Sequence, residues 1–268
     1  MAARVERLQE QQRRPSPWTW RSIVLVVLAG VLLAGIVGFA AWATTPLPPT
    51  AAALAALQSD ASVTVSIEND LIAFAPATAD AAVGLVFYPG GDVDLRAYAA
   101  PARAIAAQGY LVVIPHVLFN HAVFSPNVAE NAIAAYPEIS DWAVGGHSLG
   151  GAMAAQFAVN RPDAVDGVVL WGAYPGGDVD WTQSPLAFAV VYGTQDGLVT
   201  PDEIDTARAQ LPLDTAFVGI EGGNHAQFGD YGVQEGDLTA TISAAEQQQA
   251  ATAATVELLR QLAVSAEP

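Results

Sequence analysis

Gly146-His147-Ser148-Leu149-Gly150-Gly151 is the stretch that decides the fold predicted for this chain. It directly follows the apolar run Trp142-Ala143-Val144 and directly precedes the helix-like segment from Ala152 to Val159. This order predicts a buried strand, a tight turn that carries one serine, and a helix. The glycines two positions either side of Ser148 leave room for the turn, because a side chain there would collide with the neighbouring strand or helix.

Ser148 has two interpretations. A G-x-S-x-G pentapeptide also occurs by chance, so the serine can be an ordinary turn residue. The functional interpretation is a nucleophile, since a hydrolase activates a serine hydroxyl by holding it in an exposed, strained turn beside a base. The start of the following helix would also present free backbone N–H groups, which favour developing negative charge.

Two polar residues further along follow predicted strands. The run 188–192 is followed by Gly193-Thr194-Gln195-Asp196-Gly197, and the run 216–220 is followed by Glu221-Gly222-Gly223-Asn224-His225. Open parallel sheets place their sites just past the carboxyl ends of strands. A serine nucleophile, then an acid, then a histidine base is also the chain order that the strand–turn–helix serine motif requires.

With these segments the chain resembles the α/β-hydrolase family over residues 60 to 264, closest to its small, lidless esterase-like and dienelactone-hydrolase-like members. The resemblance implies Ser148 as nucleophile, Asp196 as the acid that orients the base, and His225 as general base. It does not fix a substrate. The segments that carry it are Phe87-Tyr88-Pro89-Gly90-Gly91, the Ser148 turn, Tyr192 to Gly197, and Gly222 to Gly229.

Alternatives exist for both partners of Ser148. His147 immediately precedes the nucleophile and cannot readily face its hydroxyl, His121 is read as a loop residue, and His116 is expected to line the pocket. For the acid, the alternatives are Asp178, Asp180 and Asp202, of which the first two follow the preceding strand. The histidines lack metal-ligand spacing such as H-E-x-x-H, so we expect neither a metal nor another cofactor.

An acyl-transfer site also needs donors for the oxyanion. The backbone N–H of Leu149 is the first candidate, and the loop after the strand 83–88 is expected to supply the second. In that loop Gly91 is preferred over Gly90 as the donor. Gly90, His116 and Trp171 are expected to contact the substrate, although Trp171 could equally be a core residue.

Alternating strands and helices predict the fold class. They indicate an α/β-hydrolase fold with a mostly parallel central sheet flanked by helices. Only residues 172–186 separate two core strands where many relatives insert a helical lid, so we expect an open site without a lid domain. Strands are predicted at 62–67, 71–75, 83–88, 111–114, 142–145, 166–171, 188–192 and 215–220, and helices at 51–57, 95–108, 127–136, 152–160, 201–209 and 243–262.

Composition limits the partners. The formal net charge is −17 and cysteine is absent, so thiol chemistry and disulfides are excluded. A surface this acidic argues against nucleic acid or anionic lipid as a partner of the main domain. The basic residues are all arginine, and half of them fall within residues 1–21.

Ser22 to Ala43 is a long uncharged run, rich in Val, Leu, Ala and Gly. As a helix it would reach roughly 33 Å, enough to cross a bilayer core of about 30 Å. The competing interpretation is a signal peptide cleaved after Ala43, because Ala41-Trp42-Ala43 fits the A-x-A pattern. Arginines in the preceding head favour a cytoplasmic N-terminus.

These observations divide the chain into a cytoplasmic basic head (1–21), a transmembrane anchor or signal peptide (22–43), a linker (44–59) and a catalytic domain (60–268). Both interpretations of the apolar run place the catalytic domain outside the cytoplasm, on a cell membrane or secreted. The expected function is a serine hydrolase that cleaves a small-molecule carboxylic ester through an acyl-enzyme. The alternative from another class is a non-catalytic binding protein with this fold at the cell envelope.

Overall fold

The computed structural model describes residues 19–177 and 179–265. It divides into two units, Met1–Thr44 and Thr45–Pro268, which are described separately. Most of the predicted basic head lies outside the described residues.

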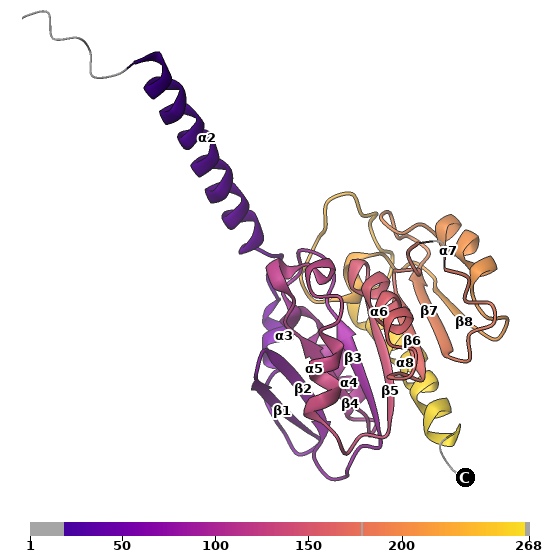
Figure 1. Ribbon diagram of the computed structural model, residues 1–268. Coiled ribbons are helices and arrows are strands. Elements are labelled where there is room, and N and C mark those ends of the chain that lie inside the picture. The colour runs from indigo at the N-terminus through magenta and orange to yellow at the C-terminus, as the bar shows by residue number, and fades with distance from the viewer. Residues whose placement is uncertain (1–18, 178, 266–268) are drawn as a thin grey trace, which may run out of the picture. The chain divides into compact units, whose positions relative to one another are not determined.

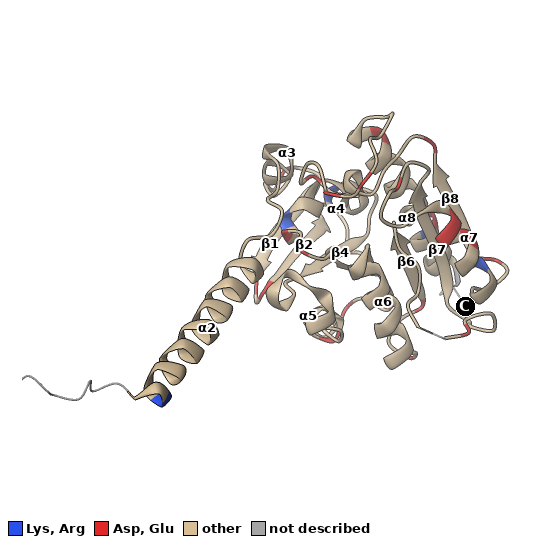
Figure 2. Ribbon diagram, turned by 90° about the horizontal axis from the view of Figure 1, so that it is seen from above, with Lys and Arg blue, Asp and Glu red and all other residues tan. Residues whose placement is uncertain are grey.

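The first unit contains the helix α2 (Trp20–Ala43). Its 24 residues correspond to about 36 Å, which exceeds a hydrocarbon core of about 30 Å. Acidic and basic side chains are absent along it beyond Arg21 in its first turn (Figure 2). Within the part of the chain that the structure describes, α2 is the one helix long and apolar enough to cross a membrane. The predicted helix at 22–43 is confirmed, and a membrane span and a signal sequence both fit it.

The second unit is built on an eight-stranded sheet of order β1-β2-β4-β3-β5-β6-β7-β8 (Figure 1). β1 and β2 form an antiparallel hairpin at one edge, β2 pairs antiparallel with β4, and the remaining strands are parallel. This confirms the predicted mostly parallel sheet. The strands are β1 (Val63–Glu68), β2 (Leu71–Pro76), β3 (Val83–Tyr88), β4 (Leu111–Pro115), β5 (Asp141–His147), β6 (Gly167–Trp171), β7 (Ala187–Gly193) and β8 (Ala216–Ile220).

Helices cover both faces of the sheet, as Figure 1 shows. α4 (Ala99–Ala106) and the long α8 (Ala244–Ser265) pack on one face, and the short α3 (Ala51–Ala55) packs against α4. α5 (Ala129–Ala135), α6 (Leu149–Asn160) and α7 (Pro201–Ala207) pack on the other. The central strands β3, β5 and β6 are buried along almost their whole length, because helices exclude water from both of their faces.

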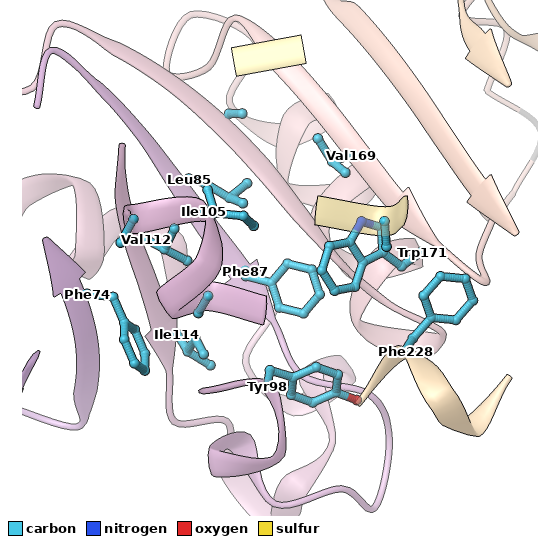
Figure 3. Packing of buried hydrophobic residues seen from close by; sticks show 14 of the residues in the cluster. Phe74, Leu85, Phe87, Tyr98, Ile105, Val112, Ile114, Val169, Trp171 and Phe228 are labelled. Carbon is cyan, nitrogen blue, oxygen red and sulfur yellow. The ribbon is translucent and has the colours of Figure 1, made fainter. Parts of the chain in front are cut away.

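Trp171, the last residue of β6, is the largest fully buried side chain. Its ring lies 4.7 Å from that of Phe87 and 6.0 Å from that of Phe228, measured between centroids (Figure 3). The indole Nε1–H donates to Thr255 Oγ1 of α8 at 3.1 Å. The sequence left Trp171 open between pocket and core, and the structure places its side chain in the core.

Local signals set the element ends. Asn69 and Asp70 both have positive φ in the turn between β1 and β2, a conformation that these short polar residues tolerate. Thr200 and Glu203 form a reciprocal capping box at the start of α7, with Pro201 in the first turn. Short elements complete the unit: η1 (Leu95–Tyr98), η2 (Leu118–Asn120), η3 (Ala122–Phe124), η4 (Arg208–Gln210) and η5 (Ala226–Phe228).

One expectation differs in detail. The single helix predicted at 95–108 is a 3-10 turn followed by α4, because Asp94 caps Arg96 N–H and tightens the first turn. Within the predicted linker, Leu47 forms a parallel bridge with Val93. Between β6 and β7, the described residues of 172–186 form no helix, in agreement with the short connection predicted there.

We predict that Thr255→Val destabilises the folded chain by about 1–3 kcal/mol, because the buried Trp171 N–H loses its acceptor. Thr252 is a matched control on the same helix, since its buried Oγ1 has no hydrogen-bond partner in the described residues. Thr252→Val should therefore leave stability unchanged or raise it slightly. Thermal unfolding of the detergent-solubilised full chain, followed by near-ultraviolet circular dichroism, measures both; equal effects would contradict the assignment.

Candidate active site

Ser148 occupies a strained turn between β5 and α6. Its backbone has φ 53° and ψ −124°, a region that non-glycine residues rarely adopt. The turn is this tight because the backbones around it are in contact: a Cβ at Gly146 would lie 2.5 Å from the carbonyl carbon of Gly150. The Ser148 N–H donates to the carbonyl of Trp171 at 2.9 Å, which fixes the turn to the neighbouring strand.

Asp196 and His225 form a buried hydrogen-bonded pair. His225 Nδ1 lies 2.8 Å from Asp196 Oδ2, and the two residues are 0% and 2% exposed. The other carboxylate oxygen accepts the N–H groups of Leu198 and Val199 at 2.9 and 2.7 Å. A carboxylate on Nδ1 favours the proton there, so the lone pair of the imidazole is on Nε2. Nε2 has no hydrogen-bond partner within the described residues.

The backbone at the end of β6, at Trp171 and Gly172, contacts both the Ser148 turn and the Asp196–His225 pair; this segment is called the β6 corner. The Trp171 carbonyl accepts the Ser148 N–H. At Gly172, with φ +47°, a Cβ would lie 3.1 Å from Asp196 Oδ2 and 3.2 Å from His225 Nδ1. A side chain here would thus crowd the pair itself, which explains a glycine directly after β6.

His147 is held away from the role of base. It is 1% exposed, and its Nδ1 lies 2.8 Å from the hydroxyl oxygen of Tyr98. Burial lowers the pKa of the His147 imidazole well below its usual value, and the nearby His225 lowers it further. Burial also raises the pKa of Tyr98, so its hydroxyl stays protonated in this hydrogen bond with a neutral His147.

The loop after β3 is organised by the same tyrosine. Gly90 N–H donates to the Tyr98 hydroxyl at 3.0 Å and is thereby occupied. Within the described residues, the N–H groups of Gly91 and Leu149 have no hydrogen-bond acceptor. The two residues are adjacent, since a Cβ at Gly91 would lie 3.1 Å from Leu149 Cδ2. This arrangement leaves two backbone donors beside Ser148 and explains why Gly91 is a better candidate than Gly90.

Asp237 is a site residue that the sequence did not reveal. Its Oδ1 accepts the N–H groups of Gly197 at 3.1 Å and His225 at 3.2 Å, and its Oδ2 accepts Ala226 N–H at 2.8 Å. It therefore ties the loop that carries Asp196 to the loop that carries His225. An aspartate after a glycine in an irregular loop gives no pattern from which this could have been predicted.

Other predicted site residues lie elsewhere. His116 is exposed and lines a separate hollow of about 260 Å³ with Asp70 and Arg96, so the expected substrate contact is not supported. The buried Trp171 side chain likewise offers no surface to a substrate. His121, read as a loop residue, has its Cδ2 only 3.5 Å from the Cβ position of Gly91.

The alternative acids are not paired with His225. Asp180 accepts the N–H of Thr182 in a local turn, and Asp202 is exposed on α7. Asp178 lies outside the described residues. Within the described residues, no cluster of three or more acidic or histidine side chains could hold a metal ion.

Comparisons with known proteins agree with this architecture. A sequence model of the alpha/beta hydrolase family matches residues 84–249, which include the Ser148 turn, Asp196 and His225. A search of curated proteins found no match. The matched region is more than half of the chain and contains the strands β5 to β8. The chain is therefore a member of the alpha/beta hydrolase family.

Proposed function

We propose that this protein is a serine hydrolase that cleaves a carboxylic ester with Ser148, His225 and Asp196. The observation that carries the proposal is the buried Asp196–His225 hydrogen bond of 2.8 Å. This pair lies beside Gly172, and the preceding carbonyl, of Trp171, accepts the Ser148 N–H. A buried imidazole with Nδ1 on a carboxylate and an open Nε2 is prepared to accept a proton.

In the first half-reaction the Ser148 hydroxyl attacks the ester carbonyl carbon while His225 Nε2 takes its proton. The carbonyl electron pair moves onto oxygen, and the N–H groups of Gly91 and Leu149 bind the oxyanion. When the electron pair returns, the alcohol leaves with the proton from His225. Ser148 is then acylated, and Asp196 has stabilised the transient imidazolium.

The second half-reaction repeats these steps with water. His225 removes a proton from the water as its oxygen attacks the acyl carbon, and the same two N–H groups bind the second oxyanion. Collapse releases the carboxylic acid and returns the proton to Ser148. All proton transfers use groups of this chain and water, so the reaction is balanced without a cofactor.

The alternative, a non-catalytic binding protein with this fold, is less well supported. A binding scaffold has no need of a serine in a strained turn together with a buried Asp196–His225 hydrogen bond. A general base requires both the orienting carboxylate and an imidazole nitrogen left open for the proton.

The N-terminal helix is included in the proposal. We propose that α2 is an uncleaved membrane anchor, since its apolar length exceeds the roughly 7–15 residues of a typical signal-peptide core. Arginines precede it, which favours a cytoplasmic N-terminus and an extracytoplasmic hydrolase domain.

Ser148→Ala should lower the hydrolysis of p-nitrophenyl butyrate by about 10⁴-fold or more, because no other hydroxyl can form the acyl-enzyme. Ser140→Ala is the control, as Ser140 is exposed at the amino end of β5. A fluorophosphonate probe should label the Ser140→Ala variant and the parent at Ser148 but leave Ser148→Ala unlabelled. Full activity of the Ser148→Ala variant would refute the assignment.

Asp196→Asn should lower kcat on the order of 10³–10⁴-fold, because an amide can no longer favour the proton on His225 Nδ1. Asp202→Asn provides the comparison, since Asp202 is exposed on the neighbouring α7. Steady-state kinetics with p-nitrophenyl butyrate distinguishes the two. Similar kcat values for both variants would remove Asp196 from the mechanism.

Asp237→Asn should lower kcat by roughly tenfold to a hundredfold with little change in KM, because small misplacement of the base slows the chemical step more than binding. Asp230→Asn is the control: Asp230 lies in the same loop region but binds Gln248 instead of the Asp196 and His225 loops. If Asp237→Asn changed only the unfolding temperature and left kcat intact, its role would be structural alone.

A further inference from the structure

The segment that leads into the hydrolase unit is fixed beside the proposed oxyanion loop. Leu47 N–H donates to the Asp92 carbonyl at 2.7 Å, and Asp94 N–H donates to the Leu47 carbonyl at 3.1 Å. Thr50 N–H donates to the carbonyl of Asp230 at 2.7 Å. The attachment point at Asp92 is the residue directly after Gly91. The chain thus enters this unit at the carboxyl ends of the parallel strands, where the site lies.

An apolar loop lies on the same edge. It contains η2 and η3, and its Asn120 carbonyl accepts the N–H of Asp92 at 2.9 Å. Leu118, Val123 and Phe124 in this loop are 49%, 49% and 50% exposed. Large apolar side chains exposed together mark an interaction surface, and here they adjoin the Gly91 side of the site.

The opposite side of the site is also apolar. Leu198 follows Asp196 and is 37% exposed, while Leu238 follows Asp237 and is 53% exposed. A Cβ at Gly197 would lie 3.0 Å from Leu238 Cγ, so these loops are in contact. The site is therefore flanked by exposed aliphatic and aromatic side chains although the chain carries a net charge of −17.

Chain connectivity sets how far this edge can lie from a bilayer. The peptide from Ala43, where α2 ends, to Leu47 can span at most about 14 Å, at about 3.3–3.6 Å per residue. Only this short peptide thus connects the end of α2 to Leu47, which pairs with the backbone beside Gly91. If α2 crosses a membrane, a lipid surface is the candidate occupant of the apolar rim, and no further protein is needed to cover it.

We propose that the substrate is a membrane-borne acyl ester, and that the loop Leu118–Phe124 contacts the lipid surface while the ester enters the site. This rests on the proposed ester hydrolase function and on α2 as an anchor. An open site without a helical lid suits this substrate, because an ester bond near the headgroup level can reach Ser148 without a lid opening.

The test uses the full chain reconstituted in phosphatidylcholine vesicles. Each variant is assayed with soluble p-nitrophenyl butyrate and with p-nitrophenyl palmitate dissolved in the vesicles. Phe124→Asp should lower palmitate hydrolysis about tenfold or more and leave butyrate hydrolysis within about twofold, because a charge opposes contact with lipid. Leu213→Asp is the matched control, since Leu213 is fully exposed in the loop before β8, at the amino ends of the parallel strands and away from the site. This variant should hydrolyse both esters at the parent rates.

A second measurement does not depend on activity. The chain has no cysteine, so Val123→Cys and Leu213→Cys can each be labelled at one position with an environment-sensitive fluorophore. The label at 123 should show a blue-shifted emission in vesicles and quenching by brominated lipid, and the label at 213 should show neither.

The outcomes separate the two proposals. If butyrate and palmitate are both left intact by the parent protein, the hydrolase assignment fails. The membrane-substrate proposal alone is overturned if p-nitrophenyl butyrate is cleaved but Phe124→Asp leaves palmitate hydrolysis unchanged. It is likewise overturned if the fluorophore on Val123→Cys remains in water. A protein partner then becomes the occupant of the apolar rim.

Discussion

The buried carboxylate of Asp196 is the constraint on which the site depends. Removing a carboxylate from water is costly unless hydrogen bonds replace its hydration. Here they come from Leu198 N–H, Val199 N–H and His225 Nδ1–H, each within 2.9 Å of a carboxylate oxygen. Satisfying this charge fixes the loop after β7 and, at the same time, fixes the orientation of the histidine after β8. Stability and chemical readiness therefore depend on the same contacts.

A second constraint comes from backbone proximity at the end of β6. The Trp171 carbonyl holds the Ser148 turn, and Gly172 allows the Asp196–His225 pair to approach the same corner. Trp171 itself is anchored by α8 through Thr255 and by aromatic contacts in the core. Trp171, which the sequence left open between pocket and core, thus supports the site through its backbone, while its indole stabilises the packing of the sheet against α8.

The sequence predicted those parts that depend on local pattern. Strand periodicity and the glycines around Ser148 are consequences of short-range sterics, so they could be read directly. The roles of Ser148, Asp196 and His225 came from the resemblance to the α/β-hydrolase family and stay predictions. The role of Asp237 could not be predicted from the sequence. Its carboxylate accepts the N–H groups of Gly197, His225 and Ala226, which lie in two loops that come close only after β7 and β8 have paired. His116 shows a related limit: the residue follows a central strand, as the sequence indicated, but it lines the hollow with Arg96, and its contact with substrate stays a prediction.

The loop after β3 shows how several weak contacts can preorganise one donor. Gly90 is bound by Tyr98, Val93 N–H donates to the Gly90 carbonyl at 3.3 Å, and Asp92 N–H is bound by Asn120. Leu47 then pairs with the backbone on either side of Val93. Gly91 lies between these fixed points, so under the proposed mechanism its N–H would be held in place before a substrate arrives, and the oxyanion would gain its hydrogen bond without reordering the loop. Since one of these contacts comes from the segment that follows α2, the attachment of the unit to its N-terminal helix and the geometry of the oxyanion donor share the same few residues.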